Sequence, residues 1–199
     1  MKKTKLWSWL WVFLGVLYFL LPLIATFDFS LRAKKGVLSL LAYQRVVEDP
    51  LFWKTILFSL EMAVLTVIVS ILIIVPTAYW IRLRLPQLRN LVEFISILPF
   101  VIPAIVLVFG FIRVFSGAPF HLTNTTIGTN AMLIAGYTVL ALPYMFRSVD
   151  NGLAAIDVRS LTEAAQSLGA GWGIIITRII FPNLRVALIS GAFITLATV

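Results

Sequence analysis

Four long apolar runs, and a fifth that reaches the last residue, constrain this sequence more than any other feature. A helix that crosses a hydrocarbon layer of about 30 Å needs about 20 mostly apolar residues. We therefore predict spanning helices at residues 6–27, 56–81, 94–112, 129–146 and 186–199 onward. Only Glu61 is charged within these runs. The pattern predicts an all-α, multi-pass membrane protein that contacts lipid.

Composition excludes several other classes of protein. Hydrophobic residues make up 61% of the chain and charged residues 12%, against about 25% charged in soluble domains. The absence of cysteine excludes disulfides, thiolate catalysis and cysteine-based metal sites. A net charge of +8 could indicate a nucleic-acid partner, but the basic residues stand in short clusters between apolar runs. That distribution is typical of membrane loops, so we expect no nucleic acid.

The distribution of basic residues also predicts orientation. Ten of the 16 fall on the side of the N-terminus and six on the other. We therefore expect a cytoplasmic N-terminus. The first run could instead be a signal peptide, but it is longer than a usual h-region and lacks a convincing cleavage site.

The fifth run is still apolar at Val199 and is too short there to cross a membrane. We therefore expect the sequence to be a fragment that stops within the fifth span.

Three residues within the spans are candidates for a substrate path. Pro99 and Pro103 lie one turn apart, so we expect the third span to be kinked or partly unwound. Such a helix could line a path or only pack against its neighbours. A carboxylate such as Glu61 is costly in lipid and needs a partner or water. It could contact a cationic substrate, although a structural bond to another helix is favoured.

The segment 157–172, between the fourth and fifth runs, predicts a short amphipathic cytoplasmic helix. Ser160 and Glu163 have the spacing of an N-terminal capping box, and Gly169 supplies a left-handed C-terminal stop. The apolar positions follow helical spacing and predict one narrow stripe: Leu161, Ala164, Ala165 and Leu168. Its small residues favour docking into a groove of a partner protein over resting on lipid.

The same segment resembles the signature of permeases from binding-protein-dependent ABC importers. That signature reads Glu-Ala-Ala, three residues, Gly, nine residues, then Ile-x-Leu-Pro. The positions that match are Glu163, Ala164, Ala165, Gly169, Ile179 and Pro182. Phe181 stands where leucine is usual. The resemblance covers most of the chain from the second span onward, and is greatest to the polyamine (spermidine/putrescine) group of type I importers.

The resemblance implies a six-span permease fold in a bacterial inner membrane, with the signature loop as a coupling helix in a cleft of a cytoplasmic ATPase dimer. It also implies a second permease subunit, the same or related, and an extracytoplasmic solute-binding protein. Glu163 would cap and orient the helix, Ala164 and Ala165 would allow close approach, and Gly169 would turn the chain back. Phe181 and Pro182 would fix the start of the fifth span.

No lysine follows a glycine, so the chain has no phosphate-binding loop and the ATP would be bound by the partner. We expect no cofactor, metal or catalytic residue in this chain. An intramembrane enzyme is one rival, but the single histidine, His121, lies outside every span. A secondary transporter or channel is the other, and it would be expected to carry several buried charges. A polyamine is the favoured substrate, and the sequence leaves homodimer and heterodimer open.

Overall fold

The computed structural model describes residues 2–32 and 37–198, and helices account for most of them. The chain divides into two compact units between Leu57 and Phe58. The first unit contains α1 (Lys2–Ser30), α2 (Leu41–Glu48) and the beginning of α3 (Pro50–Arg84). Within it, the hydroxyls of Ser30 and Tyr43 lie 2.6 Å apart.

The second unit contains the rest of α3 and all later elements. The elements are the 3-10 turn η1 (Pro86–Leu88), α4 (Arg89–Val101), α5 (Ala104–Phe115), the 3-10 turn η2 (Leu122–Asn124), α6 (Thr126–Ala154), α7 (Val158–Ser167), α8 (Trp172–Ile174), the π-helical turn η3 (Ile175–Ile180), α9 (Phe181–Asn183) and α10 (Arg185–Thr198). The all-α fold class predicted from the sequence is thus confirmed.

Three helices of the described residues are long and apolar enough to cross a membrane: Trp7–Ser30, α3 and α6. Two bent pairs, residues 86–101 with 104–115 and 172–183 with 185–198, raise the number to five if each pair is one span. Apart from residues 102 and 103, all five apolar runs are helical over their described residues, and α6 continues past residue 146 to Ala154; that each run crosses a membrane stays a prediction.

The predicted kink in the third run is confirmed, and it is sharp. α4 and α5 meet at a bend of 99°. Ile102 and Pro103 lie between the two helices. Ile102, which directly precedes the proline, has an extended backbone (φ −87°, ψ 119°). A proline ring clashes with a helical conformation at the preceding residue, which explains why α4 ends there.

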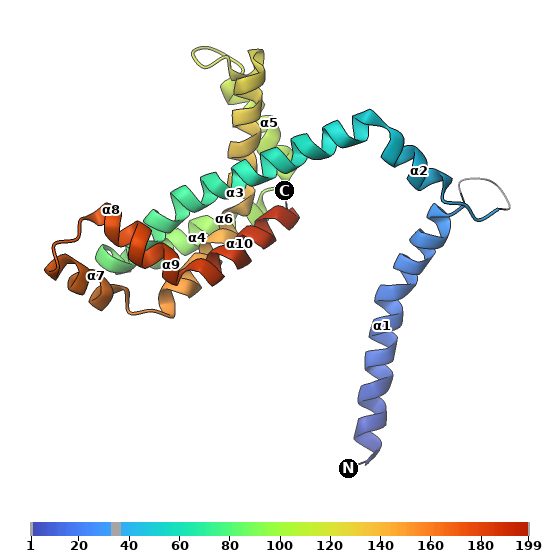
Figure 1. Cartoon of the computed structure of the whole chain (residues 1–199), viewed down its shortest axis with the longest axis horizontal. Coiled ribbons are helices and arrows are strands. Elements are labelled where there is room, and N and C mark those ends of the chain that lie inside the picture. Colours follow the sequence, from blue (N-terminus) through green and yellow to red (C-terminus); the bar gives the residue numbers. More distant parts are fainter. Residues whose placement is uncertain (1, 33–36, 199) are drawn as a thin grey trace. The chain divides into compact units, whose positions relative to one another are not determined.

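The hydrophobic core of the second unit lies where α7, α8 and α9 gather beside the end of α3 (Figure 1). α3, α6 and α7 contribute to it along with the segment that leads into α10. Its most fully buried members include Val75 and Tyr79 of α3, and Val149 and Leu153 of α6.

α6 and α10 pack closely because small residues line their contact. A Cβ added at Gly152 would lie 2.6 Å from the Ala187 Cβ, and one at Gly191 would lie 2.8 Å from the Met145 sulfur. The Ser148 hydroxyl donates a hydrogen bond of 2.6 Å to the Ala187 carbonyl. Small residues and hydroxyl bonds of this kind are typical of helix contacts in membranes.

Candidate functional site

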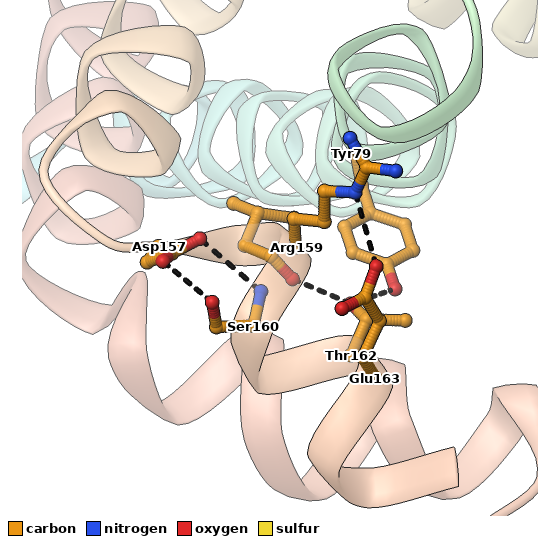
Figure 2. Close-up of polar contacts among 7 residues, drawn as sticks. Tyr79, Asp157, Arg159, Ser160, Thr162 and Glu163 are labelled. Carbon is orange, nitrogen blue, oxygen red and sulfur yellow. Dashed lines mark hydrogen bonds and ion pairs between the residues drawn. The ribbon is translucent and has the colours of Figure 1, made fainter.

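The candidate site is built on α7, which begins three residues earlier than the capping box predicted. Asp157 is the N-cap: its carboxylate accepts a bond of 3.1 Å from the Ser160 backbone N–H and one of 2.7 Å from the Ser160 hydroxyl (Figure 2). Glu163 instead pairs with Arg159, Nε to Oε1 at 3.0 Å. The Ser160–Glu163 capping box is therefore wrong. Asp caps a helix as well as Ser does, and here the earlier residue satisfies the free amides.

The bonds from Ser160 also change the acidity of the cap. They favour the ionised carboxylate, so the pKa of Asp157 lies below its usual range, chiefly through the Ser160 hydroxyl and then its backbone N–H. The negative charge stands at the positive end of the α7 dipole, which stabilises the helix.

The C-terminus of α7 confirms the left-handed stop predicted at Gly169, whose φ is +79°. The Ala170 N–H donates to the Ala165 carbonyl at 3.0 Å, and the Gly169 N–H donates to the Gln166 carbonyl at 2.9 Å. These two bonds form a Schellman motif, which reverses the chain directly after the helix.

α7 does not present the single four-residue stripe predicted from its apolar positions. Val158, Thr162 and Ala165 are buried against the core, so Ala165 faces inward and Thr162 does not face away. Ala164 is exposed, and Leu168 is 89% exposed. The physical reason is that a buried hydrogen bond and close packing, rather than side-chain polarity alone, decide which face turns inward. The exposed face consists of Ser160, Glu163, Ala164, Ser167 and Leu168, with Leu161 half-buried beside it.

A pair of buried hydroxyls joins α7 to α3. The Tyr79 and Thr162 oxygens lie 2.8 Å apart, and both residues are almost fully buried (Figure 2). The Thr162 hydroxyl also donates to the Val158 carbonyl at 2.6 Å. Because a threonine hydroxyl has one hydrogen, Tyr79 is the donor to Thr162.

Aromatic contacts hold the next part of the loop to α3. The Trp172 ring at the start of α8 meets the Trp80 ring edge to face, with 5.1 Å between centroids. The Arg84 guanidinium carbon lies 6.0 Å from the centroid of Trp172, within cation–π range. Three residues near the end of α3 therefore contact α7 at Thr162 and α8 at Trp172.

The remaining signature residues lie after α8. Ile179 is in the π-helical turn η3 and Phe181 begins α9; both are half-buried and pack on the core. Pro182 is exposed near the start of α9, where a missing N–H is tolerated. Residues 172–183 and 185–198 are bent by 75° to one another.

A charge cluster that the sequence did not single out joins α3, α4 and α6. Asp150 of α6 is 8% exposed and accepts bonds from Arg82 of α3 at 3.1 Å and from Arg89 of α4 at 2.8 Å. It ties three helices together. The sequence offers one signal for this cluster. Asp150 lies close to the predicted end of one span, and Arg82 and Arg89 lie close to the predicted ends of two others.

The substrate-path candidates are not brought together. Pro99 lines an apolar cavity of about 200 Å³ with Leu98, Ile102 and Leu107, and Pro103 caps α5 beyond the break. Glu61 is exposed on α3 and lines neither this cavity nor a larger one of about 350 Å³ between α3, α5 and α6. The larger cavity is lined mostly by apolar and aromatic residues, among them Phe58, Phe111 and Tyr137, with Thr129 and Asn130 as its polar members.

The long apolar helices and the two bent helix pairs define a multi-pass membrane protein. Residues 82–199 match the family of binding-protein-dependent transport system inner membrane components, and the chain belongs to that family. The family resemblance predicted from the signature is thus confirmed.

Similar proteins include two spermidine/putrescine transport system permease proteins called PotB. The one from Haemophilus influenzae is 29% identical over 164 residues, covering 74% of this chain and 55% of that protein. The one from Escherichia coli is 27% identical over 175 residues, covering 81% and 62%. The ferric transport system permease protein FbpB of Actinobacillus pleuropneumoniae is 31% identical over 141 residues, covering 71% and 19%. The chain thus spans little more than half the length of the PotB relatives.

Proposed function

We propose that the chain is a transmembrane permease subunit of an ABC importer and takes no part in ATP chemistry itself. α7 is the coupling helix, and its exposed face binds a cleft in a separate cytoplasmic ATPase, which works as a dimer. A second permease subunit and an extracytoplasmic solute-binding protein complete the transporter. The N-terminus and the α7 loop lie on the cytoplasmic side of a bacterial inner membrane.

The observation that carries this proposal is the exposed face of a well-anchored α7. Leu168 is 89% exposed at the C-terminal end of this capped helix. Burying its side chain in a groove of a partner would be favourable, because it removes apolar surface from water. The inner face of the same helix is already buried in the permease core. Family membership supports the same role.

We propose a polyamine as the substrate. The PotB relatives are spermidine/putrescine permeases by name. Glu61, Pro99 and Pro103 stay as candidates for the substrate path, with Glu61 the one side chain among them that could attract a cation.

The test is co-expression of the protein with the ATPase of its transporter, followed by co-purification. Leu168→Glu is compared with Gln166→Glu, which adds the same charge two residues away on an exposed part of α7 outside the proposed docking face. We expect Leu168→Glu to reduce the co-purified ATPase about tenfold or more, as for a central interface residue. Gln166→Glu should retain it.

Two results would overturn the proposal. One is wild-type protein that captures no ATPase. The other is purified protein that alone carries spermidine flux in liposomes, which would favour a channel or secondary transporter.

A further inference from the structure

We propose that the buried Tyr79–Thr162 hydroxyl pair is the joint through which displacement of α7 moves α3, which makes both residues positioning residues for coupling. This inference rests on the proposed function. It identifies the span that moves with α7 and the contact that links the two. Neither the signature loop nor the family assignment specifies that span or that contact.

The joint is suited to transmit force because both of its sides are fixed. Tyr79 is fully buried between α3 and α7, packed among core residues such as Val75 and Val149. Thr162 is 2% exposed, and its own hydrogen is committed to the Val158 carbonyl. Close-packed interiors transmit displacement because they contain few voids into which a side chain can give way.

A second contact, at Trp172, holds the segment after α7 to the same stretch of α3. The Trp172 ring meets Trp80, one residue along α3 from Tyr79, edge to face, and Arg84 lies over the Trp172 ring. The two contacts hold the loop at Thr162 and at Trp172, ten positions apart. The Tyr79–Thr162 bond, together with the buried packing of α7 on α3, should make α7 and the end of α3 move as one body.

The covalent route from α7 toward α10 is less direct. Three glycines follow α7, at positions 169, 171 and 173, and a Cβ at any of them would meet nothing within 4 Å. Beyond them the chain passes a π-helical turn and a bend of 75°. Glycines permit backbone adjustment, so displacement of α7 can be absorbed there, whereas the contact with α3 is a direct hydrogen bond.

The test removes single hydroxyls and keeps the packing. Tyr79→Phe and Thr162→Val are each made alone and together. Tyr144→Phe removes the hydroxyl of a half-buried tyrosine whose ring meets Phe100 edge to face, and Thr77→Val removes a hydroxyl bonded to the Ile73 carbonyl within α3. Each test variant thus has a control of the same chemistry.

The first readout is the stimulation of ATP hydrolysis by the spermidine-loaded binding protein, at equal amounts of co-purified ATPase. We expect Tyr79→Phe and Thr162→Val each to lower the stimulation about 2- to 30-fold, the range for residues that carry coupling between sites. The double variant should fall no further than Thr162→Val alone, because the Tyr79–Thr162 bond is already lost there together with the bond from Thr162 to the Val158 carbonyl. The controls should match the wild type.

The second readout does not depend on the substrate. The chain has no native cysteine, so spin labels at Leu85→Cys and Gln166→Cys, the latter outside the proposed docking face, report the distance between the end of α3 and α7 specifically. In the ATPase complex this distance should be the same with and without trapped ATP, and it should change with ATP once Tyr79→Phe or Thr162→Val is added.

The outcomes separate the two proposals. If the ATPase assembles and responds but the Tyr79 and Thr162 variants match their controls in both readouts, the joint is wrong and the proposed function stands. If the wild-type protein captures no ATPase, the proposed function fails and the joint with it.

Discussion

The carboxylate of Asp150 accepts a hydrogen bond from Arg89 at 2.8 Å, which joins the C-terminal end of α6 to the start of α4. Its other oxygen accepts from Arg82 at the end of α3. A nearly buried carboxylate with two arginines is therefore the polar centre of three helices that are otherwise held by apolar packing. Removing it leaves two guanidinium groups without their partner, and the side chain of Arg82 is only 23% exposed.

Asp150→Asn should destabilise the protein by on the order of 2 kcal/mol, since charged hydrogen bonds contribute about 1.5–3 kcal/mol each and the Arg89 side of the cluster is half exposed. Thermal unfolding in detergent measures the effect. Glu163→Gln is the matched control because its pair with Arg159 is exposed on both sides and should contribute about 0–1 kcal/mol. Equal shifts in the two variants would mean that burial of the Asp150 cluster adds nothing.

The close contact between α6 and α10 makes a second prediction. Gly152→Ala would place a methyl group 2.6 Å from the Ala187 Cβ and 2.8 Å from the Leu184 Cδ2, so the helices must separate. We expect a loss of about 1–3 kcal/mol, typical of overpacking. Gly110→Ala, on α5 where a Cβ meets nothing within 4 Å, should be neutral or slightly stabilising. A stable Gly152→Ala variant would show that α6 and α10 do not approach this closely.

The cap of α7 should depend on pH. The pKa of Asp157 is lower in the folded protein than in an unfolded chain, so the cap contributes stability above the unfolded value of about 3.9. The contribution is lost as the pH falls through the still lower folded pKa. Amide exchange at Ser160, corrected for its intrinsic pH dependence, should therefore quicken only under acid conditions.

Asp157→Asn is the informative variant for this effect. Asparagine caps helices about as well as aspartate but does not titrate, so the helix should persist and the acid step should disappear. An acid step that survives in Asp157→Asn would assign the titration to another group.

The elements of this fold were largely predictable from sequence, because apolar length and proline positions are local signals. The break before Pro103 and the left-handed turn at Gly169 follow from the chemistry of those residues and their neighbours alone. The start of α7 was harder to predict from the sequence, since Asp157 and Ser160 are both good N-cap residues and lie three residues apart.

The contacts that define the candidate site were not predictable. Tyr79 and Thr162 are 83 positions apart, and Asp150 is 61 positions from Arg89. No local pattern states which hydroxyl or carboxylate meets which partner at that separation. For the same reason the inward face of α7 was misassigned: the threonine at position 162 is polar, but Tyr79 supplies the bond that lets it be buried.

The left-handed turn after α7 gives the last prediction, which separates backbone conformation from side-chain crowding. Gly169 has φ +79°, and a Cβ there would meet nothing within 4 Å. Gly169→Ala should therefore cost about 1–2 kcal/mol through strain alone, quicken amide exchange at Ala170 and reduce the ATPase that co-purifies. Gly169→Asn should recover part of the loss, because asparagine tolerates this conformation better than alanine. Gly171→Ala is the control, since Gly171 is equally open but has φ −76°. If Gly169→Ala and Gly171→Ala behaved alike, the reversed turn would have no part in presenting α7.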